Sequence, residues 1–384
     1  MKHNLFFLIA VLFLATENCM PANPAPKWSV LAAESFIKRT PNPDSIHWAG
    51  QPNHFSWQAG YIMFAMEKMW HATGDYIYFR YIKLYVDQQV DENGNIPGFM
   101  PTALDNFLPG YAILFMYEQT HSEKYRIAAR KIRDSFRSYP RTADGLFWHG
   151  DWAKHQVWVD GVFMGQMFLV RYGSLTGDST AYDEVLKQMT LIAAHCQKPN
   201  GLLLHGWDES KEAGWADRTT GLASEVWSEG LGWYAVLIAD VFDYFPKSHP
   251  GYQKIRAIHQ KLCKGLKAAQ DPRSGMWCQV VDKCNEPDNW NETSGTGMFL
   301  YLLKKSIDKG YMNAAEYTPV VNRAYAGIIK KAKANGSGFI DLYDCSSIGI
   351  QNNYNAYITQ PKEISTFAAF GSFLVGTSQM EFHR

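Results

Sequence analysis

The sequence predicts an all-α protein, an (α/α)6 barrel of six helical hairpins with short extended segments at the active-site end. Two interleaved repeats and a difference in hydrophobicity between successive helical stretches support this prediction. An open helical solenoid built from the same hairpins is the alternative architecture.

The first repeat joins a turn to a tyrosine-anchored amphipathic stretch, and it recurs at 71–86, 117–136, 172–189, 244–262 and 306–328. In the second copy, Tyr125, Ala128, Ile132 and Phe136 fall at helical spacing. The stretches before the turns are apolar throughout, as in "GYIMFAMEKMW" and "GVFMGQMFLVRY". Each pair therefore predicts a buried inner helix followed by an amphipathic outer helix.

The second repeat joins a turn pair to a short apolar stretch, at 92–100, 143–151, 199–209, 273–282 and 335–344. These stretches predict short strands or extended loops after each outer helix. Five clear units and one degenerate unit fit a closed ring of six. In such a ring, the extended segments meet at the end where the inner helices begin and line a single cleft.

The N-terminus is typical of a secretory signal peptide, assigned to residues 1–22. Lys2 and His3 precede an apolar run at 5–15, which is too short to anchor the chain across a bilayer. We expect export to the periplasm or the extracellular space, with lipid attachment at Cys19 as an alternative. Residues 27–384 then form a single catalytic domain, and no other segment predicts a transmembrane span.

Composition narrows the class of partner. The 384 residues include 37 Lys and Arg against 37 Asp and Glu, and no basic run, which argues against nucleic acid or an anionic membrane. Aromatic residues make up 15% of the chain, with 13 Trp, which suits either a core or stacking on sugar rings. No HExxH zinc motif, P-loop, dinucleotide fingerprint or G-x-S-x-G elbow occurs, so no metal or cofactor is predicted. The oligomeric state is left open.

Five cysteines follow Cys19, without C-x-x-C metal spacing. Cys278 and Cys284 flank a turn and could form a disulfide in an oxidising compartment. Unpaired thiols are the favoured expectation.

Acidic residues recur at the start of four predicted inner helices: Asp105, Asp160, Glu229 and Glu292. Helix capping is the simpler explanation for any one of them. Asp105 and Asp160 favour a catalytic role, because two carboxylates converging on one cleft can divide acid and base work.

Two histidines, His149 and His205, occupy matching places in "FWHGD" and "LLHGWD". A lone histidine in an apolar setting is more often structural. Two in register, each flanked by Trp and Asp, indicate residues that line the cleft.

Five motifs together, "LDNFLPG", "FWHGDWAKHQVWVDGVFMG", "LLHGWDE", "WSEGLGW" and "NETSGTGMF", resemble glycoside hydrolase family 105, the unsaturated rhamnogalacturonyl hydrolases. That family is related to the unsaturated glucuronyl hydrolases of family 88. The resemblance runs from about Ser45 to the C-terminus, and it also implies an (α/α)6 barrel.

The resemblance implies an oligosaccharide substrate that carries a 4,5-unsaturated uronic acid at its non-reducing end. Asp160 would protonate C4 and help activate the water that adds at C5, and Asp105 would hold the sugar and tune Asp160. An apolar, Trp-rich setting beside a second acid would favour the protonated form of Asp160. The predicted substrate-binding residues are His149, Trp57, Trp158, His205, Trp227, Glu229, Trp233 and Glu292.

One position departs from the family pattern. The family commonly reads W-x-R-G-x-G-W where this chain has "WSEGLGW", so Glu229 replaces an arginine suited to an anionic substrate. Either Glu229 turns away or pairs with a nearby Lys or Arg, or the substrate differs. An ordinary inverting or retaining glycosidase using Asp160, Asp105 and Glu229 is the second hypothesis. A non-catalytic sugar-binding protein is the third.

Overall fold

The computed structural model describes residues 27–47 and 54–382, and most of them are helical. The predicted signal peptide and Cys19 lie outside the described residues. The helices are α1 (Trp28–Arg39), α2 (Trp57–Thr73), α3 (Tyr76–Gln89), α4 (Gly110–Thr120), α5 (Glu123–Ser135), α6 (Val159–Thr176), α7 (Ser179–Cys196), α8 (Ser228–Tyr244), α9 (Tyr252–Ala269), α10 (Thr293–Asp308), α11 (Ala314–Ile328), α12 (Tyr354–Ile358) and α13 (Phe367–Phe382).

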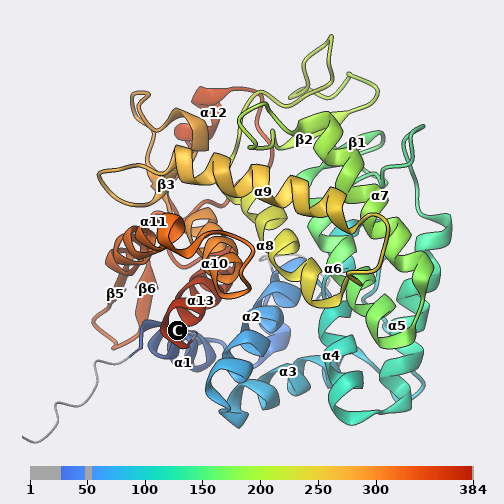
Figure 1. Cartoon of the computed structure of the whole chain (residues 1–384). Helices are drawn as coiled ribbons and strands as arrows, with labels where there is room; N and C mark the ends of the chain where they lie inside the picture. The colour runs from blue at the N-terminus through green and yellow to red at the C-terminus, as the bar shows by residue number, and fades with distance from the viewer. Residues whose placement is uncertain (1–26, 48–53, 383–384) are drawn as a thin grey trace, which may run out of the picture.

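Six helices form a closed inner ring. In order around the ring they are α2, α4, α6, α8, α10 and α13; each packs against the next, and α13 packs against α2. The outer helices α1, α3, α5, α7, α9 and α11 lie around them (Figure 1). The predicted (α/α)6 barrel is therefore confirmed, and the open solenoid is excluded.

The difference between inner and outer helices follows the sequence pattern. Fifteen of the 17 residues of α8 are buried, whereas only four of the 13 residues of α5 are. An inner helix is covered on all sides by its neighbours, so it needs apolar residues all round. An outer helix needs only one apolar stripe.

A Thr-Gly-Asp sequence explains the turn in two of the hairpins. Gly74 ends α2 and Gly177 ends α6, both in the left-handed conformation that glycine adopts without strain. The aspartate that follows each glycine caps the next helix: Asp75 accepts from the N–H of Ile77, and Asp178 from that of Thr180. One tripeptide thus stops the inner helix and starts the outer one.

The sixth hairpin is made from the two ends of the described chain rather than from a degenerate consecutive copy. The inner helix α13 packs against α1. The carboxylate of Glu381 in α13 accepts hydrogen bonds from the backbone N–H groups of Trp28 (2.9 Å) and Ser29 (3.1 Å). It therefore caps the first turn of α1, which has no side-chain cap from its own N-cap residue.

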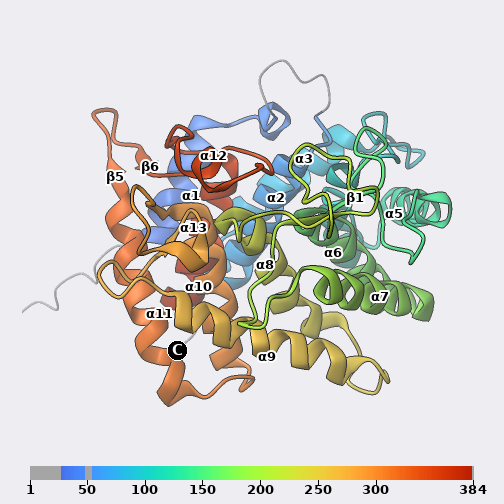
Figure 2. The same cartoon turned by 90° about the horizontal axis from the view of Figure 1, so that it is seen from above.

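Three short antiparallel strand pairs lie between hairpins: β1 (Gln156–Trp158) with β2 (Gly206–Asp208), β3 (Trp277–Cys278) with β4 (Asn291–Glu292), and β5 (Ala332–Ala334) with β6 (Ile340–Leu342). In Figure 2, β1, β6 and α12 lie along the upper side of the ring. Three of the five predicted extended segments contain a strand. The segment 143–151 makes only isolated bridges, and 92–100 contains no strand.

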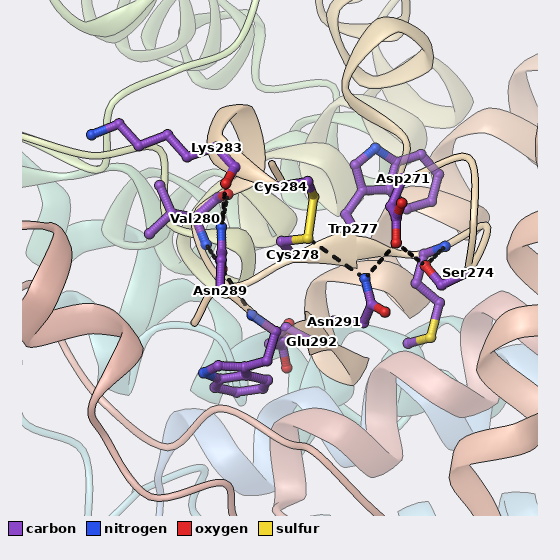
Figure 3. The surroundings of a disulfide bond; sticks show 12 residues. Asp271, Ser274, Trp277, Cys278, Val280, Lys283, Cys284, Asn289, Asn291 and Glu292 are labelled. Carbon is purple, nitrogen blue, oxygen red and sulfur yellow. Dashed lines mark hydrogen bonds between the residues drawn. A yellow bond between two sulfur atoms is a disulfide. The ribbon is translucent and has the colours of Figure 1, made fainter. Parts of the chain in front are cut away.

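A disulfide joins Cys278 to Cys284 (Figure 3), so the expectation of unpaired thiols is wrong for this pair. Cys196, Cys263 and Cys345 are free and buried. The bridged loop braces the segment before α8: the N–H of Ser228 donates to the carbonyl of Gln279 (2.9 Å), and the N–H of Val281 donates to that of Val226 (2.9 Å).

Buried charges join the inner helices; we call Glu67, Lys68, Arg171, Asp240 and Lys305 the inner charge belt. Arg171 of α6 donates to Glu67 of α2 (2.8 Å). Asp240 of α8 accepts from Lys68 of α2 (2.6 Å) and from Lys305 of α10 (2.6 Å). Burial raises the pKa of Asp240 and of Glu67, but the facing cations lower each by more, so both carboxyl groups have a pKa below the ordinary value.

Among residues 27–47 and 54–382, no helix has both the length and the hydropathy needed to cross a bilayer.

Removing Arg171 should destabilise the barrel far more than removing a surface arginine. Arg171→Met leaves Glu67 buried without its partner, which should lower the free energy of unfolding by about 3–5 kcal/mol. The control Arg126→Met removes an exposed pair with Glu123 and should leave the free energy of unfolding nearly unchanged. Guanidinium unfolding of both variants measures the difference, and equal losses would contradict the role given to the belt.

Candidate active site

A cavity of about 460 Å³ opens among the starts of the inner helices. That size suits a small ligand such as one or two sugar rings. Eight of the ten predicted site residues line it: Trp57, Asp105, His149, Trp158, Asp160, Trp227, Glu229 and Trp233. His205 and Glu292 are not among the lining residues.

Asp160 lies in the first turn of α6, with 16% of its side chain exposed. Strand β1 leads directly into this turn, and its pairing with β2 fixes the approach. The N–H of Val159 donates to the carbonyl of His205 (2.8 Å), which ties the start of α6 to the neighbouring repeat. The Asp160 carboxylate accepts from the N–H of Gly161 (2.9 Å) and is left with one edge toward the cavity.

His149 lies between the two catalytic candidates. Its Nε2 is 3.4 Å from Oδ1 of Asp105, and its Nδ1 is 3.8 Å from Oδ1 of Asp160. The ring stacks on Trp158, with centroids 4.3 Å apart. Burial lowers the pKa of His149, but the two carboxylates raise it by more, so the net shift is upward. Asp105 and Asp160 therefore both favour the cationic form of His149.

His205 lies beside Asp160 and is not among the residues that line the cavity. Its Nε2 is 3.8 Å from the same Oδ1 of Asp160, and neither ring nitrogen makes a hydrogen bond with any residue the structure describes. Burial is the main reason that the pKa of His205 falls to about 4. Asp160 raises this pKa, and His149 lowers it further. The pKa values of the two imidazoles beside Asp160 are therefore shifted in opposite directions.

A glycine follows Asp160 and Glu229, the acids in the first turns of α6 and α8, and close approach explains both glycines. A Cβ on Gly161 would lie 2.6 Å from Nδ1 of His149, and one on Gly230 would lie 2.0 Å from Nδ1 of His205. Neither helix could carry a side chain at this position without displacing its histidine. The Asp-Gly and Glu-Gly pairs in the sequence thus report where the histidine rings pack.

The structure corrects the prediction for Glu292. Its side chain is fully buried, and its carboxylate accepts from the N–H groups of Ser294, Gly295 and Ser346. Glu292 is therefore the cap of α10, and it holds the segment around Ser346 in place. The capping explanation, set aside for Asp105 and Asp160, applies here.

Four tryptophans, Trp57, Trp152, Trp158 and Trp233, form walls of the cavity. Trp57 meets Trp233 edge to face, with centroids 5.5 Å apart, and Trp158 meets Trp152 in the same way at 5.3 Å. Trp152 is 61% exposed at the rim of the cavity, and a flat exposed ring there suits stacking on a sugar.

Sequence reasoning missed the contribution of the last hairpin. The cavity is also lined by His47, Gln58 and Asn106 and by the C-terminal residues Ser346, Ser347, Ile348, Gly349, Thr366, Phe367 and Ala368. The C-terminal group lies before and at the start of α13, the inner helix whose outer partner comes from the other end of the chain. It contains neither the acid–glycine pair nor the His-Gly motif, so no repeat signal marked it.

A match to a family model identifies the family to which this barrel belongs. The model of Glycosyl Hydrolase Family 88 matches residues 28–383. The chain belongs to this family. The resemblance predicted from the five motifs is thus confirmed.

Relatives of this family 88 chain agree with that result. The structure of a family 105 glycoside hydrolase from C. acetobutylicum ATCC 824 superposes with a TM-score of 0.85 at 27% identity, over 93% of this chain and 99% of that one. Unsaturated rhamnogalacturonyl hydrolase YesR of Bacillus subtilis is 23% identical over 289 residues, which are 73% of this chain and 77% of YesR.

A third relative, protein Atu3128 of Agrobacterium fabrum, is 30% identical over 153 residues, which are 40% of this chain. The match spans 65% of the length of that protein.

Metal binding has no evident ligand set in the described part of this family 88 chain. There, no three or more His, Cys, Asp or Glu side chains are grouped so that they could hold an ion.

The charge states of the two histidines can be tested directly. NMR titration of the imidazoles should give a pKa near 4 for His205 and a raised one for His149. Asp160→Asn should lower both, because the Asp160 carboxylate acts upward on each. The surface variant Asp134→Asn should leave them unchanged. Insensitivity of His149 to Asp160→Asn would contradict the coupling.

Proposed function

We propose that this family 88 chain removes the 4,5-unsaturated uronic acid from the non-reducing end of lyase-generated oligosaccharides by hydrating its C4=C5 double bond. The observation that carries the proposal is the position of Asp160, at the cavity wall and flanked by two buried imidazoles 3.8 Å away. The name of the relative YesR, an unsaturated rhamnogalacturonyl hydrolase, supports the substrate class.

The first step is proton transfer to carbon. Asp160 delivers its proton to C4, and the positive charge that develops at C5 is shared with the ring oxygen. The aspartate becomes a carboxylate at the same moment. His149, favoured as a cation 3.8 Å away, stabilises that new charge.

The second step returns the proton. Water adds at C5, and the Asp160 carboxylate accepts the proton that the water loses, so the general acid is regenerated. The product is a hemiketal at C5. Its C5–O5 bond breaks to give a ketone at C5 and a hemiacetal at C1, which then expels the remaining oligosaccharide.

Asp105 positions the His149 ring, and the tryptophans position the sugar. Asp105 lies 3.4 Å from the far nitrogen of His149, so it orients the ring and keeps it charged. The walls formed by Trp57, Trp158 and Trp233 offer apolar faces to the sugar ring. Correct placement of C4 beside Asp160 contributes to the rate as much as the acid itself.

Replacing the proposed acid tests the assignment. Asp160→Asn keeps the shape of the side chain but cannot donate the proton, so kcat should fall on the order of 10³-fold or more. The assay follows the loss of near-ultraviolet absorbance of an unsaturated uronyl–rhamnose disaccharide, because hydration destroys the conjugated double bond. Thermal melting of the variant should match that of the native protein.

The matched control is Asp134→Asn, an aspartate on the outer helix α5 far from the cavity, which should keep full activity. Turnover by Asp160→Asn at a near-native rate would contradict the role of Asp160. Release of rhamnose without loss of absorbance, or activity on saturated glycosides, would instead favour ordinary glycoside hydrolysis.

We also propose that the chain is exported. The disulfide between Cys278 and Cys284 supports this, because such bonds persist in oxidising compartments. The signal pattern at residues 1–22 supports it independently.

Export predicts two features of the mature protein. Intact-mass analysis of the chain made in a secreting host should show loss of a leader ending near residue 22 and two hydrogens fewer than the fully reduced mass. A diacylglycerol adduct on Cys19 would identify the lipoprotein alternative. A full-length, fully reduced chain in the cytoplasm would contradict export.

A further inference from the structure

Glu229 occupies the wall of the cavity rather than turning away from it. It lies in the first turn of α8, and only 5% of its surface is exposed. The residue lines the cavity, and its Oε2 atom is buried without a hydrogen-bond partner among the described residues. Oε2 has almost no exposed surface, so Oε1 is the carboxyl oxygen of Glu229 that can contact a ligand in the cavity.

No cation pairs with Glu229. Its side chain makes no ion pair within the described ranges, and the lining residues include neither Lys nor Arg. The basic residue on the adjoining loop, Lys283, is held by Glu225 at 2.7 Å. Both explanations that would keep Glu229 out of the chemistry, turning away and pairing with a base, are therefore absent from this structure.

The surroundings of Glu229 favour its neutral form. Burial is the main cause that raises its pKa well above the ordinary value; the Glu292 carboxylate and Asp160 add to the rise, and the Ser294 hydroxyl acts against it. A neutral carboxylic acid has one O–H donor, whereas a carboxylate has none. Glu229 therefore presents a donor to the cavity where a carboxylate would present only acceptors.

The charges in the rest of the cavity do not favour an additional anion. Asp105 and Asp160 bring two carboxyl groups to the cavity with the single imidazole of His149 between them, and burial lowers the pKa of His205 to about 4. A free uronate would bring its own carboxylate into a partly buried site with no arginine or lysine to pair with it. Burying an unpaired charge is costly, whereas an uncharged group with a carbonyl oxygen needs only a donor.

We infer that Glu229 adapts the cavity to unsaturated uronides whose C6 carboxyl group is esterified, and that its O–H donates to the ester carbonyl oxygen. This inference rests on the proposed function, since it concerns the same ring and the same double bond. The ester stays intact: the proton still goes to C4 and the water oxygen still goes to C5. Elimination by a lyase that accepts esterified uronides would supply such a substrate.

Two matched substrates test the inference. One is the unsaturated uronyl–rhamnose disaccharide as the free acid, and the other is the same disaccharide as its C6 methyl ester. Loss of near-ultraviolet absorbance gives kcat/KM for each. The native protein should prefer the ester by at least about tenfold, the scale expected when a binding site leaves a polar group of the wrong ligand unpaired.

Two variants test whether Glu229 causes the preference for the ester. Glu229→Gln keeps an uncharged donor of the same size, so it should retain the preference for the ester. Glu229→Arg supplies a cation and should reverse the preference toward the free acid. If the arginine variant fails to fold, the native protein and Glu229→Gln still give the comparison.

Equal or better turnover of the free acid by the native protein would overturn the inference while leaving the proposed function intact. Loss of absorbance from neither substrate would overturn both. Equal losses on the two substrates in Glu229→Gln and Glu229→Arg would mean that Glu229 only supports the fold.

Discussion

The buried ion pair between Arg171 and Glu67, with the Asp240 cluster beside it, is the constraint on which the barrel depends. Apolar packing between inner helices is non-directional and would allow them to slide or rotate. Charges that cannot be left unpaired fix their relative height, because only one register brings the partners together. Since the pKa values of Glu67 and Asp240 are depressed, the belt stabilises the fold above the ordinary pKa of a carboxyl group and loses that contribution as the pH falls through the depressed values.

The ion pairs fix how the inner helices are aligned along their axes. This alignment also sets the positions of the cavity residues at the starts of the same helices. Asp160 and Arg171 share α6, and Glu229 and Asp240 share α8. The β1–β2 pair and the loop closed by Cys278 and Cys284 then hold the segments that enter these helices. The catalytic candidates are thus supported from both directions by rigid elements, as proton transfer to a particular carbon atom requires.

Sequence reasoning recovered the parts of the fold that repeat. Tripeptides such as Thr-Gly-Asp carry their own turn chemistry, so five hairpins were visible without any tertiary information. The closing hairpin was not, because α1 and α13 meet only after the ring is complete. Eight of ten predicted site residues line the cavity, since they occupy matching positions near the starts of the inner helices. The prediction of Glu292 as a substrate-binding residue was wrong, because capping and substrate binding can both place an acid at a helix start. Only its hydrogen bonds to Ser294 and Gly295 distinguish the two roles.

Glu229 shows why a departure from a family pattern has to be read with its surroundings. Taken from the sequence, an arginine replaced by a glutamate looks like a reversal of charge. In the structure, burial and the neighbouring Glu292 favour the uncharged acid, so the exchange is from a cationic donor to a neutral one. A donor is kept and only the charge is lost. The proposed acid Asp160, His149 beside it and the tryptophan walls can then remain unchanged, while in our inference the C6 group that the cavity accepts changes from an ion to a neutral carbonyl.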